Sequence, residues 1–297
     1  MSDVPQKVLF MGLGASGKSS IRSVTFEGKK PEEVLDYQAT INYTRSTKNF
    51  IDSSFQIFDC GGQESFISAF IGDLAEFIFS YVSIFVWVVD MSDFDQVSKS
   101  KFYFNHGLSR LNKFSPEGEV FCLFHKRDLV APEKQEETFD TMKKLFEIEN
   151  HFEIQYRTTS IFDRSVYNTI GEIIQTLILK TTKALTVSEA IQDFLIKHED
   201  LSGIIICNEE GLPLFQEGDS TNFLLPVDLS LANHEKLKQE FKNLRSLKIT
   251  MEVDDNILVL HRLKKDLLFI GIAIKAGSAQ FTIVKLDKMA ESVNKLL

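Results

Sequence analysis

A glycine-rich segment follows the first apolar run of the chain, and its spacing suits the binding of phosphates. Residues 7–20 read KVLFMGLGASGKSS, in which the apolar run at 8–11 predicts a buried strand and a helix is expected over 17–26. Between them, the spacing Gly12-x-x-x-x-Gly17-Lys18-Ser19 matches the loop that wraps the phosphates of a nucleoside triphosphate. Glycines let backbone N–H groups turn inward, and the helix adds the positive end of its dipole.

The polar residues of this loop have distinct expected roles. Lys18 would reach the β- and γ-phosphates, and the Ser19 hydroxyl would ligate Mg²⁺. The alternative is a tight strand-to-helix turn with an exposed lysine, but the position between a strand and a helix favours the phosphate loop. The residues predicted to contact the nucleotide here are Gly12, Gly14, Ala15, Ser16, Gly17, Lys18, Ser19 and Ser20.

Two later segments complete the expected catalytic site. Thr40 ends a polar connection, where a threonine can ligate Mg²⁺ through its hydroxyl. Asp59 ends a strand and can hold Mg²⁺ through its water shell, while Gly62 approaches the γ-phosphate and Gln63 orients the attacking water. A strand-ending aspartate before a glycine turn is the alternative. The predicted catalytic residues are Gln63, Lys18 and Thr40, and the predicted metal ligands are Ser19, Thr40 and Asp59.

A base-binding segment is predicted where another apolar run ends in His125-Lys126-Arg127-Asp128. The Asp128 carboxylate can accept hydrogen bonds from the ring N–H and exocyclic amine of guanine, while the stem of Lys126 lies along the base. Adenine lacks that pair of donors, so a buried Asp128 would penalise it. The backbone of Ser160 and Ile161, after the last strand of this half, is expected to reach the base edge.

Alternating apolar runs and helical patterns position these motifs. Strands are expected at 42–47, 54–59, 82–89, 120–124 and 154–159, and helices at 65–81, 96–112, 133–149 and 164–183. With the first strand, this order predicts an α/β fold of the Ras-like type, a mostly parallel six-stranded sheet with helices on both faces. The motifs then share the carboxyl ends of the strands. Whether Phe66, Phe70 and Phe77 form core or a partner surface stays open.

The pattern changes near residue 186 and predicts a second domain. Helices are expected at 187–195, 233–244 and from 279 onward, and strands at 201–207, 212–217, 247–253, 257–263 and 267–274. This order fits an α+β domain with an antiparallel sheet and helices to one side. No catalytic constellation is evident in it. The predicted domains are therefore 1–185, which binds nucleotide, and 186–297, a dimerisation or docking module.

Composition narrows the class of protein. The chain has 297 residues, a net charge of −9 and a pI near 5.3, which argues against a nucleic-acid-binding protein. Three widely separated cysteines give neither zinc spacing nor a disulfide framework, so a reducing cytoplasm is expected. The most apolar stretch, 77–89, is too short for a bilayer span of about 20 residues, which predicts no direct membrane insertion. Recruitment to a membrane surface would need a partner.

The motifs together resemble the Rag family of Ras-like GTPases, in particular its RagA branch, over residues 7–182. Gly61 and His125 stand where most Ras relatives have alanine and asparagine, and the Rag branch shares both departures. Residues 186–297 resemble a roadblock-type or longin-like domain, most clearly at SGIIICNEEGLP over 202–213. The resemblance implies GTP and GDP binding with Mg²⁺, pairing through the C-terminal domains, and regulation by activating and exchange proteins.

Several functions remain open at this point. The main hypothesis is a slow GTPase switch that pairs with itself or with a paralogous Rag-like chain, or binds other roadblock or longin proteins. The chain offers no arginine identifiable as built into the catalytic site, so slow turnover alone is expected. One alternative is a scaffold in which nucleotide is structural and the C-terminal domain carries the activity. A weaker one is an ATPase, because His125 replaces the usual asparagine.

Overall fold

The computed structural model describes residues 6–147, 151–218, 224–240, 247–253, 255–274 and 279–297. The chain forms two compact units, 1–169 and 170–297. The strands of the first unit are β1 (Gln6–Met11), β2 (Tyr43–Phe50), β3 (Ser53–Cys60), β4 (Val82–Asp90), β5 (Glu119–His125) and β6 (Ile154–Thr159). Its helices are α1 (Lys18–Glu27), α2 (Glu64–Ile71), α3 (Ala75–Phe79), α4 (Val97–Phe114), α5 (Gln135–Phe146) and the start of α6 (Ser165–Ile178).

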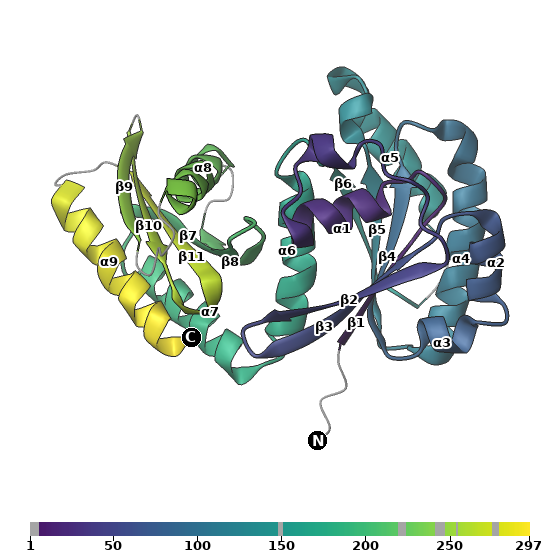
Figure 1. The fold of residues 1–297 in the computed structure, drawn as a ribbon, viewed down its shortest axis with the longest axis horizontal. Helices are drawn as coiled ribbons and strands as arrows, with labels where there is room; N and C mark the ends of the chain where they lie inside the picture. Colours follow the sequence, from purple (N-terminus) through teal and green to yellow (C-terminus); the bar gives the residue numbers. More distant parts are fainter. Residues whose placement is uncertain (1–5, 148–150, 219–223, 241–246, 254, 275–278) are drawn as a thin grey trace. The chain divides into compact units, whose positions relative to one another are not determined.

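The first sheet confirms the predicted α/β architecture. Its six strands lie in the order β2-β3-β1-β4-β5-β6, and all neighbours are parallel except the β2–β3 hairpin. The central strand β4, VSIFVWVVD, is almost wholly buried, as expected for a parallel strand covered on both faces. Figure 1 shows α1 and α6 on one face and α2 to α4 on the other. The carboxyl ends of β1, β4 and β5 therefore meet at one edge, where the motifs lie.

The aromatic side chains between the sheet and α4 hold that edge in place. Trp87 and Phe104 are fully buried with ring centroids 5.7 Å apart, and Phe85 stacks on Phe104 at 6.3 Å. The indole N–H of Trp87 donates to Ser100 Oγ at 3.0 Å, so the one polar atom of that ring is satisfied. Burying each such ring stabilises the fold by roughly 2–3 kcal/mol, before packing terms.

Two long helices predicted from the sequence are each interrupted. The segment 65–81 forms α2 and α3 instead of one helix, because the chain turns at Gly72, whose N–H is bonded to Ser68 O and whose ψ of −111° is not helical. Phe70 is core, Phe66 packs partly buried against the core, and Phe77 is 52% exposed. The segment 164–183 likewise ends at Ile178, and a new helix begins at Thr182, capped by the side chain of Thr181.

The second unit is built on a five-stranded antiparallel sheet in the order β8-β7-β11-β10-β9. Its helices are α7 (Thr182–Ile196), α8 (Leu224–Glu240) and α9 (Ala279–Leu296). Its strands are β7 (Leu201–Asn208), β8 (Pro213–Gly218), β9 (Lys248–Val253), β10 (Asn256–Arg262) and β11 (Leu267–Ile274). Helix α8 begins earlier than the expected 233, and the end of the helix predicted to run to 244 lies outside the described residues.

The expectation of helices to one side of this sheet is wrong. Val227 of α8 packs with Leu258, Leu260 and Ile270, whereas a Cβ on the adjacent Gly271 would lie 2.6 Å from Leu286 of α9. Because successive strand residues point to opposite faces, α8 and α9 cover opposite faces of the sheet. Figure 1 shows α7 beside α9, so this unit has three layers. The strands β7, β10 and β11 are buried on both faces, which requires cover on both.

The division between the units falls inside α6, while the boundary expected at 185 and 186 lies inside α7. In the first half of α6, Tyr167 donates its hydroxyl to Val24 O of α1 at 3.3 Å. In the second half, a Cβ on Gly171 would lie 2.6 Å from Pro213 of β8. The structure thus assigns the end of α6 to the second unit. No helix in the described ranges is long and apolar enough to cross a membrane.

Candidate nucleotide-binding site

The glycine-rich loop wraps around its own lysine. Gly12 and Gly17 have φ values of 148° and 96°, which side-chain-bearing residues rarely adopt. The Lys18 ammonium is 5% exposed and donates to Gly12 O at 2.9 Å, Leu13 O at 2.8 Å and Ser16 Oγ at 3.2 Å. Burial lowers the pKa of Lys18 to about 8. A phosphate in the loop would offer this buried cation a negative partner.

A cavity of about 330 Å³ opens beside this loop within the first unit. Most residues predicted from the sequence to bind nucleotide line it. They are Gly14, Ala15, Gly17, Lys18, Ser19, Ser20, Thr40, Gly62, Gln63, His125, Lys126, Asp128 and Ile161. Four predicted residues are absent from the lining, namely Gly12, Ser16, Asp59 and Ser160. Gly12 and Ser16 accept hydrogen bonds from Lys18, and Ser160 donates one to Asp128. Asp59 forms an ion pair with Arg22 of α1.

Oxygen atoms suited to Mg²⁺ converge at the start of α1. The hydroxyl oxygens of Ser19 and Thr40 are 2.8 Å apart and share a hydrogen bond. The Asp59 side chain is 1% exposed, and neither of its carboxylate oxygens has a hydrogen-bond partner among the described residues. Burial raises the pKa of the Asp59 carboxyl, because the charged form is desolvated. Hydroxyl and carboxylate oxygens are the donors that Mg²⁺ prefers, so these residues fit the ion.

Glycines bring the segments around Thr40 and Gln63 into contact with the phosphate loop. Gly61 donates its N–H to Asn42 O at 2.6 Å, and a Cβ on Gly61 would lie 2.5 Å from Thr40 O. A Cβ on Gly62 would lie 2.5 Å from Gly14 N. A methyl group at 61 would therefore push Thr40 away from Ser19. Gln63 lies exposed at the N-terminus of α2, with its side chain on the cavity.

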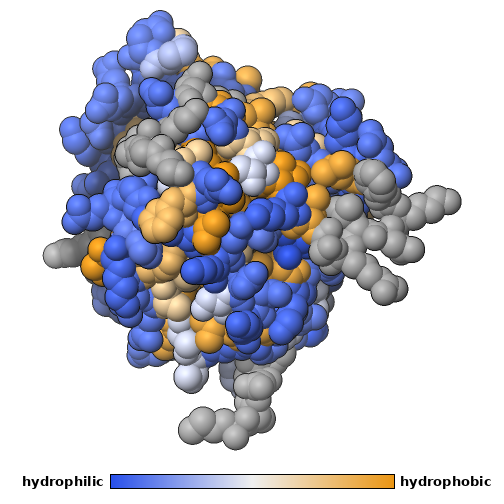
Figure 2. Space-filling view, turned by 90° about the vertical axis from the view of Figure 1, so that its left-hand side faces the viewer, coloured by the Kyte–Doolittle hydropathy of each residue, from blue (hydrophilic) through white to orange (hydrophobic). Residues whose placement is uncertain are grey.

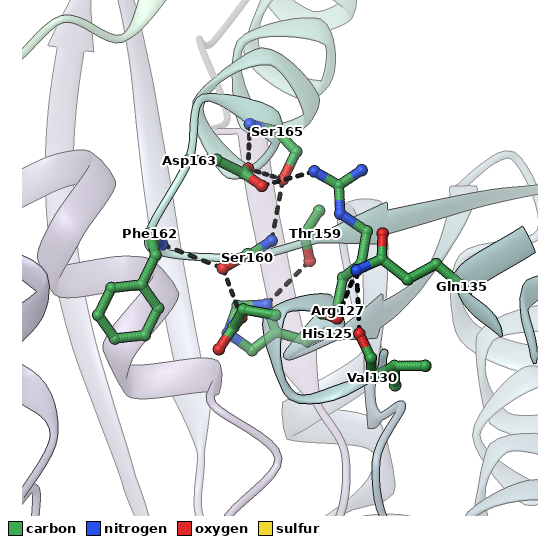
Figure 3. Close-up of polar contacts among 10 residues, drawn as sticks. His125, Arg127, Val130, Gln135, Thr159, Ser160, Phe162, Asp163 and Ser165 are labelled. Carbon is green, nitrogen blue, oxygen red and sulfur yellow. Dashed lines mark hydrogen bonds and ion pairs between the residues drawn. The ribbon is translucent and has the colours of Figure 1, made fainter. Parts of the chain in front are cut away.

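The far end of the cavity carries the predicted base-binding residues. Ser160 Oγ donates a short hydrogen bond to Asp128 Oδ1 and accepts one from Phe162 N at 3.1 Å. Figure 3 shows Ser160 and Phe162 on the connection that follows β6. Asp128 itself is exposed, not buried as expected, because it lies in the turn after β5 at the cavity mouth. A bound base would be needed to cover it.

The stem of Lys126 is held from its far end. Lys126 adopts a left-handed conformation, with φ of 63°, and its ammonium donates to Asp90 Oδ2 at 2.7 Å. Asp90 ends β4 and also accepts from Ser92 N at 2.9 Å. Burial acts to raise the pKa of the Asp90 carboxyl, but the hydrogen bonds from Lys126 and Ser92 outweigh it and lower that pKa. This ion pair fixes the aliphatic part of Lys126 along one wall of the cavity.

His125 joins the phosphate loop to the base-binding end. Its ring is 2% exposed, and Nδ1 shares a hydrogen bond with Thr159 Oγ1 at 2.9 Å, as drawn in Figure 3. A Cβ on Gly17 would lie 2.4 Å from the ring, so only glycine allows this packing. Burial lowers the pKa of His125 from 6.5 to about 4, and the ring is neutral at physiological pH.

Acidification is expected to destabilise the first unit through His125. Folding lowers the pKa of His125, so protonation of the ring favours the unfolded chain. The contribution of His125 to the free energy of unfolding is therefore fully present above pH 6.5 and falls by about 3 kcal/mol as the pH decreases toward 4. Urea unfolding of the full chain between pH 4 and 7 measures this slope. Since His125→Asn cannot take up the proton, its free energy of unfolding should depend less on pH. Equal slopes in both proteins would contradict the assignment.

Several residues on the cavity were not predicted from the sequence. They are Val34, Leu35, Tyr37, Gln38, Ala39, Cys60, Leu129 and Phe162. Tyr37 to Ala39 directly precede Thr40, and Phe162 directly follows Ile161, so adjacency to a predicted residue was the available signal. Leu129 and Phe162 are 63% and 52% exposed and lie on the cavity next to the predicted base-binding residues Asp128 and Ile161.

Comparisons with known proteins agree with these motifs. The family described as "Gtr1/RagA G protein conserved region" matches residues 7–209, more than half of the chain. "GTP-binding protein GTR1" of Saccharomyces cerevisiae is 30% identical over 270 residues, which cover 86% of this chain and 87% of that protein. "GTP-binding protein gtr2" of Schizosaccharomyces pombe is 26% identical over 301 residues, covering 97% and 92%.

A third relative matches the N-terminal part only. "Ras-related GTP-binding protein A" of Dictyostelium discoideum is 30% identical over 176 residues, which cover 58% of each chain. The resemblance to the Rag family inferred from the motifs is thus confirmed by a family match that reaches beyond the first unit. This chain belongs to the Gtr1/RagA G protein family.

Proposed function

We propose that this protein is a Rag-type GTPase switch that binds GTP and GDP with Mg²⁺ and hydrolyses GTP slowly. The observation that carries the proposal is the single cavity onto which Lys18, Gln63 and Asp128 all open. These residues come from three separate segments. Lys18 suits the phosphates of a guanine nucleotide, Gln63 suits the water that attacks the γ-phosphorus, and Asp128 suits the base. Family membership supports the same assignment.

The chain's own residues divide the work of binding and hydrolysis. Lys18 and the amides of the loop neutralise phosphate charge, and Asp128 selects guanine through two accepted hydrogen bonds. Ser19, Thr40 and Asp59 would hold Mg²⁺, which supplies positive charge against the phosphate oxygens. Gln63 orients the attacking water from the N-terminus of α2. Such a site accelerates the reaction mainly by positioning and electrostatics.

The composition of the cavity supports the proposal of slow turnover. No arginine is among the residues that the structure places on its wall. The positive charge that such reactions need beyond Lys18 and Mg²⁺ would come from an activating protein, and an arginine supplied in trans accelerates related reactions by roughly 10³–10⁵-fold. An exchange protein would reset the switch.

The proposed pairing module is the roadblock-type domain of residues 186–297, which lies within the second unit. Its sheet ends in the edge strands β8 and β9, and an edge strand can pair with a strand of another chain. Figure 2 shows hydrophobic surface among hydrophilic residues on the side where α9 lies in Figure 1. Exposed apolar side chains of α7 and α9 are Leu185, Ile196, Phe281 and Val284. Similarity to both GTR1 and gtr2 supports a paralogous Rag-like partner as well as a second copy.

Nucleotide titration combined with light scattering tests this proposal on the full chain. We expect micromolar or tighter binding of fluorescent GDP and of a non-hydrolysable GTP analogue, at least 100-fold weaker binding of the adenine nucleotides, and the mass of a dimer when the partner is present. Equal affinity for adenine and guanine nucleotides would contradict the switch. If the chain binds its partner equally well with GDP and with the GTP analogue, the scaffold alternative is favoured. We propose that the protein is cytoplasmic and that its partner determines whether it is recruited to a membrane surface.

A further inference from the structure

Asp59 is a buried carboxylate with little compensation from hydrogen bonds. It is the penultimate residue of β3 and is 1% exposed, and neither of its oxygens meets hydrogen-bond geometry in the described part of the chain, although the neighbouring Ser19 hydroxyl acts to lower the pKa of the carboxyl. A buried charge of this kind is costly unless a cation lies close to it. The nearby Lys18 ammonium is already bonded to three oxygens of its own loop.

The cation that faces Asp59 is Arg22. It lies three residues after Ser19 on α1, hence on the same face of the helix, and its Nε is 3.5 Å from Asp59 Oδ2. The Nε–H is buried and has no hydrogen-bond partner among the described residues. The guanidinium thus sits opposite the carboxylate as an ion pair without a hydrogen bond.

The opposite edge of the guanidinium is anchored elsewhere. Nη1 donates to Glu27 Oε1, and Nη2 donates to Ser23 Oγ at 3.4 Å. These contacts hold Arg22 within its own helix, and Arg22 is not among the residues that line the cavity. Its position therefore suits an action on Asp59 and not on the phosphates.

We propose that Arg22 is a resident counter-cation for Asp59, which stabilises the metal-free state and thereby weakens the binding of Mg²⁺. The inference rests on the proposed function, in which Asp59 contributes to the Mg²⁺ site. With the ion bound, Asp59 would face two cations whose mutual repulsion is not screened by water. Without it, Arg22 is the cation that pairs directly with the buried carboxylate, and the Lys18 ammonium adds its charge from farther within the phosphate loop. Arg22 would then make nucleotide retention sensitive to the Mg²⁺ concentration.

The experiment measures the release of fluorescent GDP from the full chain across a series of Mg²⁺ concentrations. Arg22→Met removes the charge but keeps the length of the side chain, Arg22→Lys keeps a charge, and Glu27→Gln removes the outer anchor only. We expect the Mg²⁺ concentration that half-maximally slows release to be roughly tenfold lower for Arg22→Met and close to the wild-type value for Arg22→Lys and Glu27→Gln. The melting temperature in EDTA should fall for Arg22→Met.

Three outcomes would overturn the inference, and each has a separate meaning. In the first, Mg²⁺ slows GDP release from the wild type, but the half-maximal Mg²⁺ concentration for Arg22→Met is unchanged or higher. This result would show that Arg22 does not weaken Mg²⁺ binding, and it would leave the proposed function intact. Slower hydrolysis by Arg22→Met at saturating Mg²⁺, with the Mg²⁺ response unmoved, would make Arg22 a catalytic residue instead. A wild-type chain whose GDP release ignores Mg²⁺ would remove the proposed Mg²⁺ site, and the inference with it.

Discussion

Asp128→Asn is expected to lower the affinity for GTP by roughly 100-fold and to give the chain a preference for xanthine nucleotides. Guanine presents two donors, its ring N–H and its exocyclic amine, to the two carboxylate oxygens. Asparagine has an NH₂ donor in place of one carboxylate oxygen. This donor would face the exocyclic amine of guanine, which is also a donor, so neither group forms a hydrogen bond, at a cost of about 3 kcal/mol. Xanthine carries a carbonyl in place of that amine and matches the asparagine amide. Competition titrations with GTP, XTP and ATP measure the change.

Asp163→Asn is the matched control for this variant. Asp163 lies in the neighbouring connection, pairs with Arg127 and accepts from Ser165, and does not line the cavity. Its replacement should leave the preference for guanine unchanged. If both variants lose GTP equally and neither gains XTP, the effect comes from a disturbed loop and Asp128 does not read the base.

Gln63→Leu should retain GTP affinity and lose roughly 10- to 100-fold in the rate of hydrolysis. Leucine has a similar volume, and position 63 is exposed, so the fold should be unaffected. What is lost is the amide that orients the attacking water, an effect on the barrier and not on ground-state binding. Single-turnover hydrolysis of GTP at saturating Mg²⁺, with nucleotide affinity measured separately, tests this.

The chain offers a second cavity-lining glutamine as a control. Gln38 belongs to the segment before Thr40, and we expect Gln38→Leu to hydrolyse GTP within about twofold of the wild-type rate. Unchanged turnover in Gln63→Leu would remove Gln63 from the mechanism. A fast rate in the wild-type chain without any activating protein would contradict the proposal that the arginine comes from a partner.

Gly61 and His125, the two residues that differ from most Ras relatives, each pack against a neighbouring segment of the site. Gly61 stands where most Ras relatives carry alanine, and the structure places Thr40 O and Asn42 O within 2.7 Å of where that methyl would be. The missing Cβ lets the segment with Thr40 lie against β3, which brings its hydroxyl to Ser19. His125 similarly fills space that a side chain at position 17 would occupy. The departures from the common pattern are therefore coupled to local packing.

The elements were predictable where hydrophobic periodicity was unambiguous. The apolar runs at 8–11, 82–89 and 120–124 became the central strands β1, β4 and β5 of one sheet, because parallel strands buried on both faces need continuous apolar sequence. Periodicity alone did not reveal where helices stop. Both interruptions, at Gly72 and at Leu179 to Thr181, depend on turns whose cost is offset by tertiary packing. The second sheet's cover on both faces was likewise missed, since helix order does not specify a face.

The sequence by itself determined the family and the chemistry that this protein offers. The loop from Gly12 to Ser19 is contiguous, so its spacing alone dictates how backbone N–H groups and Lys18 are presented. Only the tertiary structure decided which side chains support them. The pairs Arg22–Asp59, Asp128–Ser160 and His125–Thr159 join residues more than 30 positions apart. Such contacts arise because neighbouring strands and α1 end at one edge of the sheet, a consequence of strand order that local sequence does not encode.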